Sequence, residues 1–172
     1  MSTTTRMRRV SRLGALTMAG IGAALLYGSV ASPQTPAASS RTIAFTEVEN
    51  KTPCCIVDVA PKSHGKREPM MSPGDQLVFS QKVRDPSGKP IGKLYGDCSA
   101  ITEAPLTRAR FICDGVYSFT DGTMTATGLG GVGDPTSSGA ITGGTGAYAN
   151  ARGTFSSKTT KTGNDTLVTL TD

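Results

Sequence analysis

Residues 140–155, AITGGTGAYANARGTF, form the densest glycine cluster of the 172-residue chain. Gly144, Gly146 and Ala149 fit the G-x-G-x-x-A pattern of a dinucleotide-binding loop. Such a loop needs a helix directly after it, whose N-terminus receives the phosphates. The segment that follows is typical of a strand and leaves no room for a crossover helix. We therefore expect no nucleotide site, and predict a tight turn between strands in which Gly143, Gly144 and Gly146 permit positive φ.

The sequence around this turn is typical of strands throughout. Runs of Thr, Val, Ile, Phe and Tyr are bounded by Gly, Pro, Asp and Asn, and no window shows helical periodicity over three turns. Eight strands predict an all-β fold, a closed eight-stranded antiparallel β-barrel, because closure removes exposed edges; a β-sandwich is the alternative. The predicted strands are 42–48, 76–84, 90–101, 106–119, 122–130, 138–143, 151–161 and 165–171.

Alternation along the strands predicts which side chains point into the barrel. Cys98 and Cys113 fall on the same face of two adjacent strands, so we expect them to form a disulfide. Cys54 and Cys55 are then left over. The inward sets are Leu77, Phe79, Gln81 and Val83 on one strand, Leu94, Gly96, Cys98 and Ala100 on the next, and Phe111, Cys113, Gly115, Tyr117 and Phe119 on the third.

The first 31 residues have the order of a secretory signal peptide. Four arginines precede the uncharged apolar run 13–30, and Ser29 and Ala31 provide the small residues of a cleavage site. A membrane-spanning anchor is the alternative, since the run is just long enough to cross a bilayer. We expect a secreted, extracellular protein with a disordered tether over 32–40 and a barrel domain over 41–172.

Removal of this leader changes the charge of the chain. The leader holds 4 of the 18 basic residues and none of the 13 acidic ones, so the remainder has a net charge of 14 − 13 = +1. No basic stripe remains that would indicate nucleic-acid binding. Residues 50–74 form a long predicted loop, of a length that is usually functional or disordered. It contains the only histidine, His64, but its spacing to Cys54 and Cys55 fits no standard metal pattern, and we predict no metal site.

Two polar residues interrupt the apolar inward faces. Glu47 shares its face with Ile43 and Phe45, and Gln81 shares its face with Leu77 and Phe79. A carboxyl group inside an apolar barrel has a raised pKa or needs a partner, and a neighbouring amide could supply one or orient a water molecule. Such a pair could polarise an oxygen of a bound substrate. The alternative is that Glu47 lies at the barrel mouth, in contact with water.

The glycine-rich turn and the strands before it resemble those of dirigent proteins and allene oxide cyclases. Segments 75–84 (DQLVFSQKVR), 91–98 (IGKLYGDC), 110–128 and 140–155 follow the order and spacing of that superfamily, and the resemblance covers most of 41–157. It implies an eight-stranded barrel with a central apolar cavity. Related barrels often form dimers or trimers, so the resemblance is also compatible with a homo-oligomer.

The resemblance to plant allene oxide cyclases implies roles for individual residues. In those enzymes a glutamate, two asparagines and a cysteine hold a water against the epoxide of the substrate. Glu47 matches the glutamate and Cys98 the cysteine, whereas Glu49 and Gln81 stand at the asparagine positions and differ in type. Dirigent proteins instead bind phenoxy radicals or quinone methides in the cavity and steer their coupling or cyclisation.

We therefore expect an exported barrel that binds a small apolar molecule and guides its cyclisation or isomerisation, without a cofactor. Glu47, Gln81 and Glu49 are the candidate catalytic residues. The alternative is a non-catalytic barrel that binds a ligand or partner through the 50–74 loop. The predicted cavity-lining residues are Phe45, Leu77, Phe79, Leu94, Phe111, Tyr117 and Phe119.

Overall fold

The computed structural model describes residues 40–48, 55–59 and 69–171. The predicted signal peptide, nearly all of the predicted tether, Glu49, Cys54 and His64 lie outside the described residues. Within the described part of the chain, no helix is long and apolar enough to cross a membrane.

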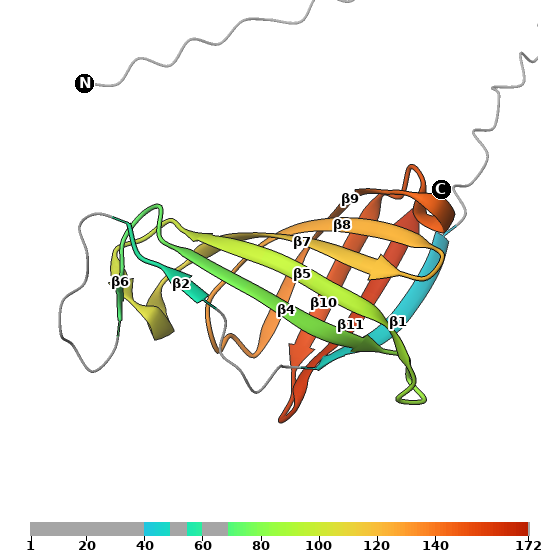
Figure 1. Cartoon of the computed structure of the whole chain (residues 1–172), viewed down its shortest axis with the longest axis horizontal. Helices are drawn as coiled ribbons and strands as arrows, with labels where there is room; N and C mark the ends of the chain where they lie inside the picture. Colours follow the sequence, from blue (N-terminus) through green and yellow to red (C-terminus); the bar gives the residue numbers. More distant parts are fainter. Residues whose placement is uncertain (1–39, 49–54, 60–68, 172) are drawn as a thin grey trace, which may run out of the picture. The chain divides into compact units, whose positions relative to one another are not determined.

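Eight long strands form a closed antiparallel barrel, which confirms the predicted fold class (Figure 1). The sheet runs in the order β1-β11-β10-β9-β8-β7-β5-β4, and β4 closes the circle by pairing with β1, where Glu47 lies opposite Val83. The strands are β1 (Ser40–Val48), β4 (Gln76–Arg84), β5 (Pro90–Ala100), β7 (Phe111–Phe119), β8 (Gly122–Gly130), β9 (Thr136–Gly144), β10 (Gly153–Thr159) and β11 (Gly163–Thr171).

Several short elements accompany these eight strands. β2 (Cys55–Val57) pairs with the first residues of β4, and β3 (Met70–Met71) pairs with β6 (Ala104–Pro105), so the predicted 50–74 loop contains two short strands. Figure 1 shows β2 and β6 toward the same end of the barrel. The predicted strand 106–119 is too long, because Pro105 leads into a 3-10 turn, η1 (Leu106–Arg108), and β7 begins at Phe111. Proline has no N–H to donate to a continuing ladder.

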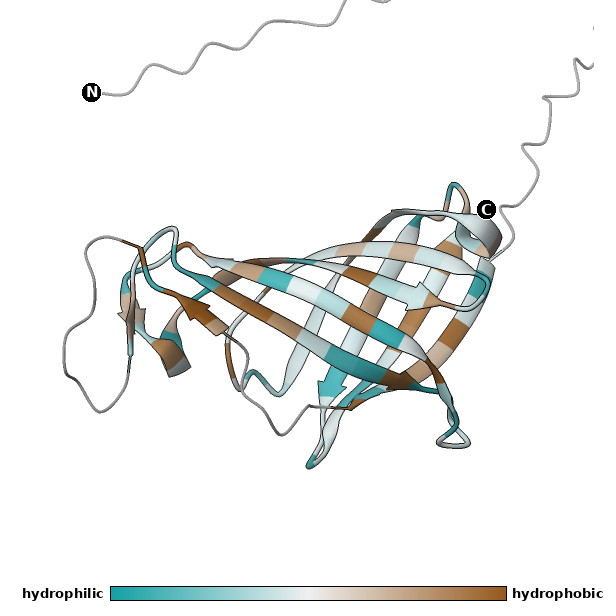
Figure 2. Ribbon diagram, in the orientation of Figure 1, coloured by the Kyte–Doolittle hydropathy of each residue, from teal (hydrophilic) through white to brown (hydrophobic). Residues whose placement is uncertain are grey.

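The barrel interior follows the predicted alternation, visible as alternating bands along the strands in Figure 2. Val83 and Tyr117 point inward and are buried, whereas Val78, Tyr95 and Ile112, one position out of phase, are each more than 40% exposed. The buried side chains form two clusters. The turn-end cluster contains Phe45, Val83, Leu94, Tyr117, Met124, Ala126, Ile141, Tyr148, Ala151, Val168 and Leu170. The β6-end cluster contains Met71, Leu77, Cys98, Ala100, Ala109 and Phe111.

A disulfide joins two neighbouring strands within the β6-end cluster. Cys98 on β5 lies directly opposite Cys113 on β7, and the two are bonded, as predicted. Cys55 is exposed and is a free cysteine.

The glycine-rich segment of residues 140–155 contains the connection from β9 to β10, which includes a 3-10 turn, η2 (Gly146–Tyr148). Of the three glycines predicted to provide positive φ, only Gly146 does so, at 58°. Gly144 is needed for another reason: a Cβ there would lie 2.4 Å from the Tyr148 carbonyl oxygen and 2.5 Å from that of Thr123. Gly143 meets neither constraint, since a Cβ there would approach only side chains.

Replacing Gly146 by alanine should therefore destabilise the barrel. Its Cβ would lie 2.3 Å from the Asp121 carbonyl oxygen at a backbone conformation that disfavours side chains. We expect the free energy of unfolding in urea to fall by more than about 1 kcal/mol. Gly130→Ala is the matched control, because nothing lies within 4 Å of a Cβ there, and it should change stability by less than about 0.5 kcal/mol. Equal effects of the two substitutions would contradict this account.

Candidate functional site

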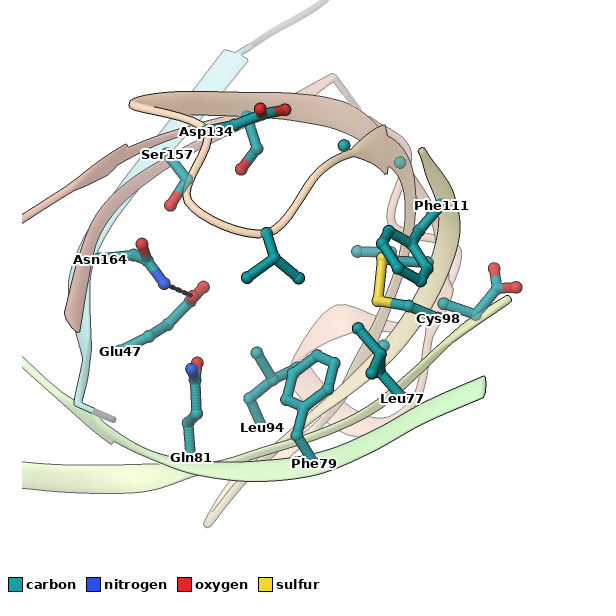
Figure 3. A pocket seen from close by; sticks show the side chains of 18 of the residues that line it. Glu47, Leu77, Phe79, Gln81, Leu94, Cys98, Phe111, Asp134, Ser157 and Asn164 are labelled. Atoms are coloured by element: carbon teal, nitrogen blue, oxygen red, sulfur yellow. Dashed lines mark hydrogen bonds between the residues drawn. A yellow bond between two sulfur atoms is a disulfide. The ribbon is translucent and has the colours of Figure 1, made fainter. Parts of the chain in front are cut away.

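A pocket of about 940 Å³ occupies the barrel interior, within the size range of small-molecule sites. Of the predicted cavity residues, five line it: Leu77, Phe79, Leu94, Phe111 and Tyr117. Figure 3 shows Leu77, Phe79 and Phe111 close together on one wall, with Glu47 and Asn164 across the pocket from them.

The prediction was wrong for Phe45 and Phe119, which do not line the pocket. Both rings pack with Tyr117 on the side of the turn-end cluster, with centroid distances of 5.0 Å from Phe45 to Tyr117 and 6.1 Å from Phe119 to Tyr117. Phe119 also contacts Tyr148 of η2 at 5.2 Å. These aromatic rings fill the barrel next to the pocket, and Tyr117 is the one ring of this aromatic group that also lines the pocket.

Glu47 lines the pocket and is only 6% exposed, so its side chain is buried. Its Oε1 accepts hydrogen bonds from the Tyr117 hydroxyl at 2.6 Å and from the Thr166 hydroxyl at 3.0 Å. Its Oε2 receives one long contact, from the Asn164 side-chain amide at 3.5 Å (dashed in Figure 3). The two carboxyl oxygens therefore differ: Oε1 is held firmly, and Oε2 is held weakly.

A chain of hydroxyl groups supports this carboxyl group from neighbouring strands. Ser157 on β10 lies 2.6 Å from the Thr166 hydroxyl on β11. Because Thr166 directs its single proton to Glu47, Ser157 is the donor in this pair. The chain runs from β10 through β11 to β1 and fixes the orientation of the carboxyl group.

Burial controls the protonation of the site. Desolvation raises the pKa of Glu47 above its ordinary value of 4.5, although the hydrogen bonds from Tyr117, Thr166 and Asn164 act in the opposite direction. Burial, and then the neighbouring Glu47 charge, raises the pKa of Tyr117 far above its normal range, so this hydroxyl remains a donor. When Glu47 is protonated, its proton belongs on Oε2, because Oε1 already accepts two hydrogen bonds.

Gln81 extends from β4 into the same pocket, as Figure 3 shows. Its Oε1 is buried and has no hydrogen-bond partner among the described residues. The structure thus brings together Glu47 and Gln81 of the three predicted catalytic residues, while Glu49 lies outside the described part of the chain.

The sequence alone did not reveal the polar groups on β10 and β11 that support this carboxyl group: Asn164 and Thr166, which bond to it, and Ser157, which bonds to Thr166. They stand in a Thr-rich region of ordinary β composition, and Asn164 and Thr166 are 117 and 119 positions away from Glu47. The register of β11 against β1, which puts Asn164 opposite Glu47, is the only signal that could have found them.

The segment between β8 and β9 passes over the pocket (Figure 3). Asp134 holds this segment in place by accepting hydrogen bonds from the Arg110 guanidinium and the Gly131 N–H, each at 2.8 Å. Nowhere within residues 40–48, 55–59 and 69–171 do three His, Cys, Asp or Glu side chains gather as a metal ion would require.

The raised pKa of Glu47 predicts a dependence of stability on pH. The folded state binds this proton more tightly than the unfolded chain does, so the contribution to stability is present below pH 4.5 and is lost as pH rises through the folded-state pKa. Glu47→Gln should remove that loss, which can be measured as the melting temperature over a pH series. Replacing exposed Glu103 by glutamine should leave the decline in place. A parallel decline in wild type and Glu47→Gln would contradict the assignment.

Comparisons with known proteins agree with the barrel fold. Solved structures with the same fold include a pyocyanin demethylase (24% identity, TM-score 0.56, covering 77% of this chain and 99% of that one). They also include a pterocarpan synthase dirigent protein (21%, 0.51, 78% and 82%). A third is a nonspecific heme-binding cyclase that catalyses a 4 + 2 cycloaddition in neoabyssomicin biosynthesis (19%, 0.54, 78% and 68%).

No curated protein sequence matches the chain. The model of the allene oxide cyclase barrel like domain matches residues 57–169, which is well over half of the chain and includes six of the eight long strands and most of β11. The chain therefore belongs to the allene oxide cyclase barrel like family.

Proposed function

We propose that the barrel binds a small, largely apolar molecule in its pocket and guides the cyclisation or isomerisation of that molecule. The observation that carries the proposal is the position of Glu47, a buried carboxyl group whose weakly held Oε2 faces a pocket with an apolar wall. Apolar walls with a few placed polar groups are typical of small-molecule sites.

Glu47 is suited to act as a proton donor to an oxygen of the substrate. Burial keeps its proton in place to higher pH than an ordinary carboxyl group would, and general acids work best when their pKa lies near the working pH. The proton on Oε2 stabilises negative charge as it develops on the substrate oxygen during bond rearrangement. Tyr117 and Thr166 stabilise the carboxylate that remains, and the proton returns when the rearrangement is complete.

The related structures support a small-molecule cavity more than any single reaction. Their names describe a demethylase, a pterocarpan synthase and a cycloaddition catalyst, so one barrel hosts several chemistries. We favour cyclisation because the polar groups around Glu47 can donate one proton and take it back, which is all that a rearrangement without oxidant or co-reactant requires.

The experiment uses the fact that an isomerisation conserves mass. The protein is incubated with a small-molecule extract of the organism that encodes it, and the products are compared by chromatography and mass spectrometry. We expect one compound to be replaced by another of identical mass. Glu47→Gln should slow this conversion by about a hundredfold or more, the usual contribution of general acid catalysis.

Two variants at Gly130 test whether the pocket is the place of reaction. Gly130 lines the pocket, and nothing lies within 4 Å of a Cβ there. Gly130→Phe should fill the pocket and abolish conversion, while Gly130→Ala should retain it. Full activity of Glu47→Gln would exclude the proposed role of that residue, and conversion with a change of mass would exclude isomerisation. No conversion by wild type would favour the alternative, a non-catalytic binding barrel.

We also propose that the protein is exported, on the strength of the basic and apolar order of its first 31 residues. The expected mature chain begins near Ser32. N-terminal sequencing of the protein from cells and from the surrounding medium tests this, and a cell-retained chain that still begins at Met1 would contradict it.

A further inference from the structure

We infer that the pocket selects uncharged substrates that carry a hydroxyl or N–H group, and that it rejects carboxylates and other anions. The inference rests on the proposed function, because it assumes that the pocket binds a small molecule. It adds the chemical class of that molecule.

The described residues that line the pocket provide no positive charge for an anion. Among the described residues that line it, Glu47, Asp114 and Asp134 are acidic, and none is Lys, Arg or His. Asp134 is paired with Arg110 at 2.8 Å, and Arg110 does not line the pocket. A ligand carboxylate placed here would lose its hydration without gaining a cation.

The hydroxyl groups around Glu47 do not replace that cation. Tyr117 and Thr166 direct their protons to Oε1 of Glu47, and Ser157 directs its proton to Thr166. These donors are therefore already used within the protein. An anionic ligand would also lie near Glu47, and any negative charge on Glu47 would repel it.

The side-chain carbonyl of Gln81 is an acceptor that a ligand could satisfy. Its Oε1 is buried in the pocket without a hydrogen-bond donor among the described residues. A buried acceptor without a partner is unfavourable, so a ligand that supplies a donor gains over one that does not. Sites built to hydrogen-bond a hydroxyl group reject analogues that lack it.

The two polar groups lie close together on the inner wall. Glu47 is opposite Val83, and Gln81 is two residues before Val83 on the same inward face of β4. Figure 3 shows the Gln81 side chain pointing toward Glu47. The pocket therefore offers a proton donor, Glu47 Oε2, beside an acceptor, Gln81 Oε1. Leu77 and Phe79 continue the inward face of β4 beyond Gln81, and with Phe111 they form the apolar wall across the pocket from Glu47 (Figure 3). This arrangement fits a neutral, largely apolar ligand that carries an acceptor oxygen close to a hydroxyl or N–H donor.

Three probes with the same naphthalene ring test whether the pocket prefers neutral ligands that carry a donor. The full chain is titrated at neutral pH with 2-naphthol, which is neutral and carries a donor, with 2-methoxynaphthalene, which is neutral without a donor, and with 2-naphthoate, which is anionic. Binding is followed by calorimetry. We expect 2-naphthol to bind about tenfold more tightly than 2-methoxynaphthalene. We expect 2-naphthoate to bind about a hundredfold more weakly than 2-naphthol, or not measurably.

Variants at position 81 assign the effect to Gln81. Gln81→Leu should remove the preference for 2-naphthol over 2-methoxynaphthalene. Gln81→Lys should add a cation to the pocket and increase the affinity for 2-naphthoate. Lys82→Gln is the matched control, because Lys82 is the next residue on β4 and is exposed, and it should leave all three affinities unchanged. Melting temperatures show whether each variant folds, and the comparison of the three probes on wild type needs no variant.

The outcomes separate the two proposals. Tight binding of 2-naphthoate by wild type would overturn the exclusion of anions and leave the binding pocket intact. Equal affinity for 2-naphthol and 2-methoxynaphthalene would overturn the role of Gln81. If none of the three probes binds, and Gly130→Phe and wild type behave alike, the proposed cavity function fails and this inference fails with it.

Discussion

The hydrogen bond from Tyr117 to Glu47 is the constraint on which the site depends. A carboxyl group among apolar side chains is tolerated only when its oxygens have partners. Tyr117 supplies one of them at 2.6 Å, and its ring is held by Phe45 and Phe119. The packed aromatic end of the barrel therefore fixes the position of a polar group in the open part. Tyr117 belongs to both regions, so the packing of the core fixes the position of this hydroxyl group in the pocket.

Alternation along the strands was enough to predict much of this structure. The period of two placed Leu77, Phe79 and Gln81 on one face, and the same rule on β5 and β7 brought Cys98 and Cys113 together. It also predicted Glu47 on the inward face, since that residue has the parity of Phe45. A residue type that breaks an otherwise apolar face is visible in a single sequence, and this is why Glu47 and Gln81 could be found.

Alternation does not tell how far along the barrel axis an inward side chain lies. Phe45 and Phe119 have the correct parity, but Phe45 packs in the turn-end cluster and Phe119 packs against it, so neither lines the pocket. Depth depends on strand register, which is set by contacts between distant residues. The same limit hid Ser157, Asn164 and Thr166, whose importance arises only when β11 lies between β1 and β10. Gly143 and Gly146 look alike in the sequence, and only the path of the chain separates them.

The first long strand, β1, pairs with the last, β11, so the two ends of the barrel's chain lie side by side. Ser40 at the start of β1 lies opposite Thr171 at the end of β11. A short linker between these two residues would produce a circular chain, which could then be opened at an exposed turn such as that between Arg84 and Pro90. The strands could thus begin at a different point along the sequence and still occupy the same order around the barrel. The arrangement of Glu47, Asn164 and Thr166 would survive such a rearrangement, because it belongs to the closed ring of strands and not to either end of the polypeptide.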